Sequence, residues 1–136
     1  MPTGKSSWLY ALAGCALFCA AGVVAQQPRP EPQTIPLVCA GRYCPLLKGP
    51  PQTAGMRSGF VRLAPGETVG RHTTGDHEGT LVILRGRGVA LLDGGRKLSF
   101  TAPAAVYIPP STFHNVLNAG KGPLEYVYVV APAAQR

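Results

Sequence analysis

The chain has 136 residues, a formal charge of +7 and a hydrophobic fraction of 46%, which is enough for one modest core and leaves little room for a second domain. Its Lys and Arg residues are scattered, and no basic run or basic face with interleaved aromatic residues indicates nucleic-acid binding. The charge is therefore interpreted as solvated surface, with an arginine or two available to an anionic ligand.

The first 25 residues have the features of a secretory signal peptide. Lys5 precedes an apolar stretch from Trp8 to Ala25, which ends in the small residues that signal peptidase requires. Cleavage after Ala25 would place the mature protein in the periplasm or outside the cell. Two alternatives stay open: a lipoprotein anchored through Cys15, which follows Leu12-Ala-Gly, and a membrane anchor formed by the uncleaved apolar run.

Residues 26–55 are rich in proline. Because proline fixes φ and removes a backbone donor, this segment is predicted to be an extended N-terminal arm and not a helix. It contains Cys39 and Cys44, an even pair that favours a disulfide in an oxidising compartment. Free thiols, or thiolates that bind copper or zinc, are the alternatives. The spacing is not that of a Cys-x-x-Cys redox motif.

Beyond Met56 the sequence changes to short apolar runs bounded by Gly, Pro, Asn or Asp. Strands are predicted at residues 60–63, 80–84, 89–92, 97–100, 105–108, 114–117 and 124–130. Gly86, the Asp93-Gly-Gly sequence and the stretch from Gly120 to Pro123 supply turn signals between them. Residues 56–132 are therefore predicted to form one all-β domain, a sandwich or barrel.

The three histidines of the chain fall in two short blocks of this domain. His72 and His77, with Glu78, lie in the first block, and His114 lies in the second. Neutral imidazole is the commonest protein ligand for transition metals, and a neighbouring carboxylate suits Zn, Mn, Fe, Ni or Cu. The blocks predict one divalent metal site with His72, His77 and His114 as ligands. Glu78 is expected to be a fourth ligand or to accept an imidazole N–H.

The two blocks resemble the two motifs of the cupin superfamily, whose fold is a small double-stranded β-helix, or jelly roll. In the first motif a glycine is followed by five residues and a histidine, as Gly66 is followed by His72, and the motif closes near Gly86. The second motif, Pro-x-Gly-x-x-His-x-x-x-Asn, is matched by Pro109, Ser111 in place of glycine, His114 and Asn118. The resemblance covers roughly residues 59–131 and implies a small single-domain cupin.

Two positions depart from the family pattern. Thr74 stands where the first motif has its second histidine, and Gly79, not Glu78, stands at the usual carboxylate position. Because side chains alternate along a strand, Glu78 is expected to point outward unless a bulge turns it inward, whereas His77 shares the parity of Gly79. The ordinary four-ligand set is therefore incomplete, and whether His77 or Glu78 is a ligand stays open.

Each of these residues also has a plain structural interpretation. His72 and His114 would be hydrogen-bonded barrel residues without metal, and His77 and Glu78 would lie in a solvated loop. Asn118 is expected to shape the turn near His114. The aromatic residues expected to line the core or the pocket are Tyr107, Phe113, Tyr126 and Tyr128. Arg71 is expected at the surface, or at the pocket mouth facing an anion.

Two function classes remain. The favoured one, because of the missing histidine and displaced glutamate, is an exported cupin that binds a divalent metal, a small-molecule ligand or both, without turnover. The alternative is a metal-dependent oxygenase or isomerase acting on a small anionic or carbonyl-containing molecule, with Glu78 moving protons. Fold analogy alone does not select between them. Cupins of this kind often pair by edge strands, so a homodimer is also expected.

Overall fold

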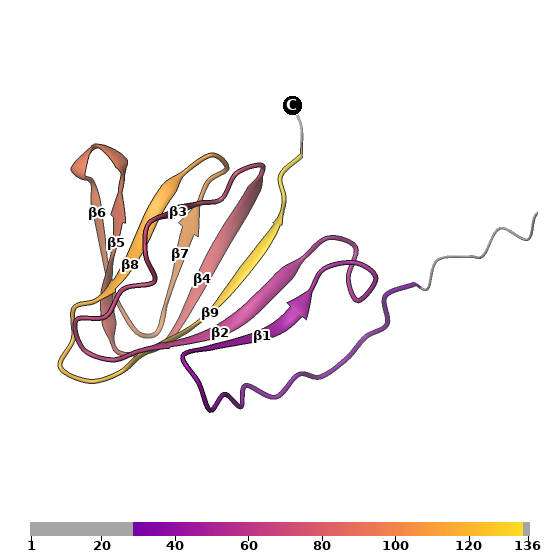
Figure 1. Ribbon diagram of the computed structural model, residues 1–136, viewed down its shortest axis with the longest axis horizontal. Coiled ribbons are helices and arrows are strands. Elements are labelled where there is room, and N and C mark those ends of the chain that lie inside the picture. Colours follow the sequence, from indigo (N-terminus) through magenta and orange to yellow (C-terminus); the bar gives the residue numbers. More distant parts are fainter. Residues whose placement is uncertain (1–28, 135–136) are drawn as a thin grey trace, which may run out of the picture.

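The computed structural model describes residues 29–134, which fold into two β-sheets that face each other (Figure 1). The larger sheet has the strand order β1-β2-β9-β4-β7 and the smaller one β3-β8-β5-β6. The strands are β1 Tyr43–Lys48, β2 Arg57–Leu63, β3 His72–Thr73, β4 His77–Arg85, β5 Arg87–Leu92, β6 Lys97–Thr101, β7 Ala104–Ile108, β8 Phe113–Asn118 and β9 Leu124–Pro132. All their pairings are antiparallel. Consecutive strands lie in different sheets, except that β1 pairs with β2 and β5 pairs with β6 within one sheet. The predicted all-β jelly roll, or double-stranded β-helix, is confirmed.

Every strand predicted from the apolar runs is present, and β2 and β4 begin a little earlier than predicted. Two further strands, β1 and β3, were not predicted. β1 lies within the proline-rich segment, where Pro45 is tolerated because β1 is an edge strand of the larger sheet. β3 has only two residues, too few to produce a periodic pattern. Part of the segment predicted as an arm is thus built into the sheet.

Side-chain alternation creates the core between the sheets. On β4, Leu81 and Ile83 are buried, whereas Val82 and Leu84 between and after them are 40% and 44% exposed. The buried cluster consists of Val61, Leu63, Leu81, Ile83, Ala90, Phe100, Val106, Ile108, Val116, Leu124 and Tyr126. These residues come from strands of both sheets, so the apolar faces are buried against each other.

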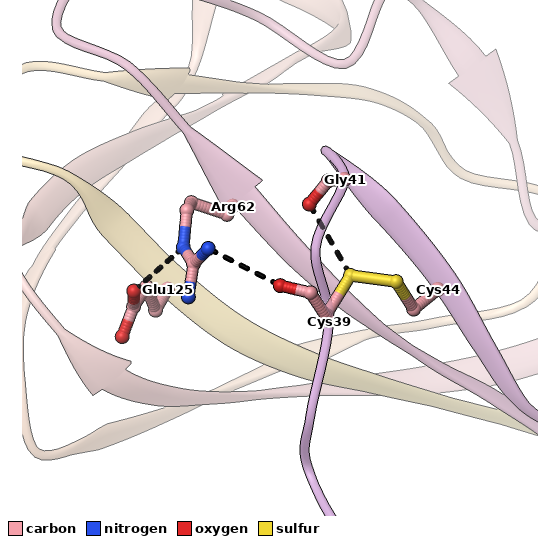
Figure 2. The surroundings of a disulfide bond; sticks show 5 residues. All are labelled: Cys39, Gly41, Cys44, Arg62 and Glu125. Atoms are coloured by element: carbon pink, nitrogen blue, oxygen red, sulfur yellow. Dashed lines mark hydrogen bonds and ion pairs between the residues drawn. A yellow bond between two sulfur atoms is a disulfide. The ribbon is translucent and has the colours of Figure 1, made fainter.

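The predicted disulfide between Cys39 and Cys44 is present, with its Cα atoms 5.7 Å apart (Figure 2). Arg62 on β2 donates from Nε to Glu125 Oε1 on β9 at 2.8 Å and from Nη1 to the Cys39 carbonyl at 3.2 Å. Gly41 O lies 3.2 Å from Cys39 Sγ, which is a contact and not a hydrogen bond because a disulfide sulfur carries no proton. The start of β1 is therefore tied covalently to the arm, and the arm is tied through Arg62 to two neighbouring strands.

The predicted signal peptide, residues 1–25, lies outside the described residues. From residue 29 to residue 134, no helix is long and apolar enough to cross a membrane.

Candidate metal and ligand site

The register of β3 and β8 places His72 directly opposite His114. Directly opposed residues of an antiparallel pair project from the same face of the sheet, so both imidazoles point in one direction. Their ring centroids are 4.2 Å apart and the ring planes are inclined by 57°. The fold thus brings together two histidines that belong to different sequence blocks.

Each of the two rings is anchored through Nδ1 to a backbone carbonyl two residues earlier in the chain. His72 Nδ1 lies 2.9 Å from the Gly70 carbonyl oxygen, and His114 Nδ1 lies 3.2 Å from that of Thr112. A carbonyl only accepts hydrogen bonds, so in the neutral rings Nδ1 carries the proton and Nε2 keeps its lone pair. Neither Nε2 atom has a hydrogen-bond partner within residues 29–134. This is the arrangement that metal-binding histidines adopt.

Burial also favours the neutral form of one ring. The His114 side chain is buried, and desolvation lowers the pKa of its imidazole below the ordinary value of 6.5. The hydrogen bond to Thr112 opposes this shift, and the nearby His72 adds to it. At neutral pH, His114 is therefore an uncharged imidazole that can donate its Nε2 lone pair.

Both histidines line a cavity of about 490 Å³ between the two sheets. The aliphatic part of its wall comes from Val61, Val69, Leu81, Ile108, Val116 and Val130. Tyr43, Tyr126 and Tyr128 add aromatic surface, and Arg57 is the one residue in the lining that carries a full charge. Burial raises the pKa of Tyr126, with Tyr43 as a further cause, so its phenol stays protonated. The cavity is of the size and polarity that suit a small molecule with a polar end.

Two glycines lie on the inner face beside this cavity: Gly59 makes room for the Tyr128 ring, and Gly79 lines the cavity itself. Gly59 lies opposite Tyr128, and a Cβ at residue 59 would come within 2.6 Å of the tyrosine ring, which would have to move. Gly79 lines the cavity at the position where the cupin motif has its carboxylate. The site therefore has free volume where the family pattern has a metal ligand.

The structure does not bring Glu78 to the histidine pair. β4 keeps its regular alternation at this point, and its irregularity lies between Ile83 and Arg85, so Gly79 faces the cavity and Glu78 faces outward. There Glu78 Oε2 accepts a hydrogen bond of 2.8 Å from the Tyr107 hydroxyl of β7. Glu78 therefore points outward, as strand alternation predicted, and the alternative of a bulge that turns it inward is wrong.

His77 also lies apart from His72 and His114. It shares the inward parity of Gly79, but it is the first residue of β4 and does not line the cavity. Both of its ring nitrogens have partners: Nδ1 is 2.6 Å from Asp76 Oδ1, and Nε2 is 3.2 Å from Arg57 Nη2. The predicted set of three histidines and a glutamate is thus not assembled. Within the described part of the chain, no three His, Cys, Asp or Glu side chains are grouped to hold a metal.

Thr74, which replaces the second motif histidine, has a structural role. Its hydroxyl donates to the Pro109 carbonyl at 2.8 Å and accepts from the Thr112 backbone N–H at 3.1 Å. It therefore joins the first histidine block to the second.

Ser111, which replaces the motif glycine, adopts φ = 53° and donates its backbone N–H to the Gly75 carbonyl at 2.7 Å. The turn before His114 thus keeps a left-handed residue although the glycine is absent.

The remaining predicted residues divide into two groups. Tyr126 and Tyr128 line the cavity and Asn118 is buried in its turn, as expected. Tyr107 and Phe113, expected in the core or pocket, are 54% and 40% exposed, because their parity places them on outer faces. The surface location expected for Arg71 is confirmed: it stacks on the Phe113 ring at 4.0 Å and pairs with Asp93 at 2.8 Å.

Two residues of the cavity lining, Arg57 and Tyr43, were not predicted from the sequence. Arg57 lies before the predicted start of its strand, although its parity with Val61 and Leu63 would have placed it on the inner face. Tyr43 belongs to β1, which the proline content concealed.

Two antiparallel sheets enclosing a cavity with a histidine pair on its wall define a β-barrel of the jelly-roll class. The cupin domain family matches residues 59–130, more than half of the chain. The chain belongs to the cupin family. No curated protein matches its sequence.

Several solved structures share the fold. A cupin 2 conserved barrel domain protein from Salinispora arenicola is 26% identical, with a TM-score of 0.59 over 80% of this chain and 91% of that one. A predicted oxalate decarboxylase from Thermotoga maritima is 24% identical, with a TM-score of 0.61 over 67% of this chain and 79% of that one. The Schizosaccharomyces pombe Cnp3 cupin domain is 16% identical, with a TM-score of 0.60. The match with Cnp3 covers 67% of this chain and 64% of that chain.

Cupins often bind metals, and the residues of this barrel fit such an ion in part. His72 and His114 supply two imidazole nitrogens that are adjacent, anchored and without partners in the described chain. The cavity lining supplies no carboxylate. The donor set therefore suits a divalent transition metal with two protein ligands and open positions, and it does not suit a closed four-ligand site.

Proposed function

We propose that this protein is an exported binding cupin, in which His72 and His114 hold a divalent transition-metal ion and the adjoining cavity takes a small molecule. The pair of anchored rings with unbonded Nε2 atoms on the cavity wall is the observation that carries the proposal. A bound ion would supply Lewis-acid positions for oxygen or nitrogen atoms of the ligand. The chain itself would orient the ion and exclude water from the apolar wall.

Binding is favoured over turnover by the placement of the carboxylates. An oxygenase or isomerase needs a group that moves protons near the substrate, and Glu78 was the candidate. Glu78 instead faces outward against Tyr107, and the cavity lining contains neither Asp nor Glu. The tyrosine with a raised pKa, Tyr126, would serve as a hydrogen-bond donor and not as a base.

Export is supported by the disulfide between Cys39 and Cys44, because such bonds persist in oxidising compartments and are rare in the cytosol. The apolar N-terminal sequence that ends at Ala25 gives a route for export. N-terminal sequencing of the protein from the exported fraction would locate the cleavage site, and a mature chain beginning at Cys15 would indicate a lipoprotein instead.

The experiment that tests metal binding compares histidine variants. Protein purified from the exported fraction is analysed for metal content, and its metal-free form is titrated with Zn²⁺ and Ni²⁺. His72→Ala and His114→Ala should each lower occupancy by roughly tenfold or more, because one protein ligand remains. His77→Ala is the matched control and should leave occupancy unchanged, since both its ring nitrogens are already bonded. Circular dichroism checks that the variants fold.

Wild-type protein without stoichiometric metal, or equal losses in the His72→Ala and His77→Ala proteins, would contradict the metal proposal. If metal is retained, oxygen consumption with dicarbonyl, thiol and aromatic compounds separates binding from catalysis. Sustained consumption that disappears in His72→Ala would establish the enzyme alternative.

A further inference from the structure

The charges around the cavity are unbalanced. Arg57 contributes the only full charge of the cavity lining. The lining also contains two histidines, and it contains neither Asp nor Glu. Three other arginines of the described chain are neutralised by acidic partners: Arg42 by Glu67 at 3.7 Å, Arg62 by Glu125 at 2.8 Å and Arg71 by Asp93 at 2.8 Å. Arg57 differs from these three because its partner is a histidine.

The position of Arg57 in the sheet explains why its charge reaches the cavity. On β2 it has the same parity as Val61 and Leu63, whose side chains are buried on the inner face. Arg57 pairs with Val130 of β9, and Val130 pairs on its other side with Gly79 of β4. Because Gly79 has no side chain, this row of the inner face is not filled, and the exposed side chain of Arg57 stands at the solvent-open edge of the cavity.

A short chain of hydrogen bonds holds the guanidinium at this place. Asp76 Oδ1 is 2.6 Å from His77 Nδ1, and a carboxylate acceptor requires the proton of the neutral ring to be on Nδ1. His77 Nε2 can then accept from Arg57 Nη2 at 3.2 Å. The His77 ring separates the guanidinium from the Asp76 carboxylate, which is 89% exposed, so no carboxylate between residues 29 and 134 contacts Arg57. The remaining guanidinium N–H groups have no partners in the described residues. His77 is thus a positioning residue for Arg57.

We infer that the cavity selects a small monocarboxylate with an apolar body, bound through its carboxylate to Arg57 and through its body to the aliphatic wall. The planar guanidinium matches a carboxylate with two parallel hydrogen bonds. A single cation compensates a single negative charge, and a second carboxylate on the body of the ligand would be buried against the aliphatic wall without a partner. This inference rests on the proposal that the barrel cavity is the binding site, but it does not depend on a metal ion.

The test compares acids with neutral molecules of the same shape. Octanoate and 3-phenylpropanoate are titrated calorimetrically into the metal-free full-length protein, alongside octanamide and 3-phenylpropanamide. Each acid should bind roughly tenfold or more tightly than its amide, because the amide lacks the charge-assisted hydrogen bonds. Arg57→Gln should weaken acid binding by a similar factor and remove the preference, whereas amide binding stays nearly unchanged. Arg57→Lys should retain part of the preference, since it keeps the charge but not the planar geometry.

Arg96→Gln is the matched control, because Arg96 is exposed, lies outside the cavity lining and changes the net charge equally. It should bind like the wild type. Equal affinity of the wild type for acids and amides, an acid preference that survives in Arg57→Gln, or no binding of any acid would each overturn the inference. Repeating the titrations with Zn²⁺ in the His72→Ala protein separates the two proposals. An acid preference that persists there supports the role of Arg57 even if metal binding fails.

Discussion

His72, His77 and His114 share one side-chain chemistry, and they differ in what their ring nitrogens contact. His72 and His114 donate from Nδ1 to backbone carbonyls and keep Nε2 free, whereas His77 is bonded at both nitrogens. The first two can therefore bind an ion or a ligand atom, and the third can only position a neighbour. Residue type and spacing indicated a histidine-based site, but they did not distinguish these roles.

Burial of His114 predicts an acid-sensitive fold. Its folded-state pKa lies below the unfolded value of 6.5, so the unfolded chain takes up the proton first as the pH falls. The free energy of unfolding of metal-free protein should therefore decrease as the pH is lowered from about 6.5 toward the folded-state pKa. Urea unfolding measured on both sides of this window checks the expectation. His114→Gln should reduce the decrease, and His77→Gln should retain it; an identical slope in His114→Gln would contradict the assignment.

Asn118 is the polar residue on which the turn after β8 depends. It is 1% exposed, donates from Nδ2 to the carbonyls of Leu63 and Gly122 at 2.9 Å each, and accepts from the Gly120 N–H at 2.8 Å. Asn118→Ala should lower the free energy of unfolding by about 2–3 kcal/mol, because three backbone groups lose their partner and the Leu63 carbonyl among them is buried.

A matched control for Asn118 lies on the same strand. Asn115 Oδ1 is buried without a hydrogen-bond partner among the described residues, so Asn115→Ala should cost less than about 1 kcal/mol. Chemical unfolding of both variants gives the comparison. Equal losses would show that the hydrogen bonds of Asn118 do not hold the turn.

At the scale of elements, strand register decides which residues meet. His72 and His114 are neighbours because a strand of only two residues, β3, pairs with β8 at that point. The same alternation sends Glu78 outward and leaves Gly79 and Arg57 on the inner face. Alternation along the strand predicted from the sequence that Glu78 points outward. Arg57 was missed because its strand was predicted to begin at residue 60, whereas β2 begins at Arg57.

The disulfide should stabilise the arm and β1 together. Cys39 and Cys44 are five positions apart, so the closed loop is short and its loss should cost about 2 kcal/mol, near the low end for disulfides. The variant in which both cysteines are serine should therefore unfold at a lower urea concentration than the wild type. Dithiothreitol should lower the stability of the wild type and leave the variant unchanged. Equal stability of the reduced and oxidised wild type would exclude this role.

At the scale of the whole molecule, the association of chains stays a prediction. The larger sheet ends in the edge strands β1 and β7, and the smaller one in β3 and β6. Exposed edges carry unpaired backbone groups, which pairing between two copies would satisfy. Sedimentation equilibrium or light scattering of the mature protein should give a mass of about two chains. A single species at the monomer mass over a wide concentration range would contradict the expected homodimer.

The sequence by itself determined the all-β class, the strands with apolar runs and the two histidine blocks, and it favoured the disulfide that the structure contains. Alternation, turn residues and motif spacing are local along the chain, so they can be recognised in the amino-acid sequence alone. Only the tertiary structure decided that two of the three histidines meet, that Glu78 faces away, and that Tyr43 and Arg57 border the cavity. These facts depend on strand register and on which strands are neighbours, and a shift of one residue would send each side chain to the opposite face.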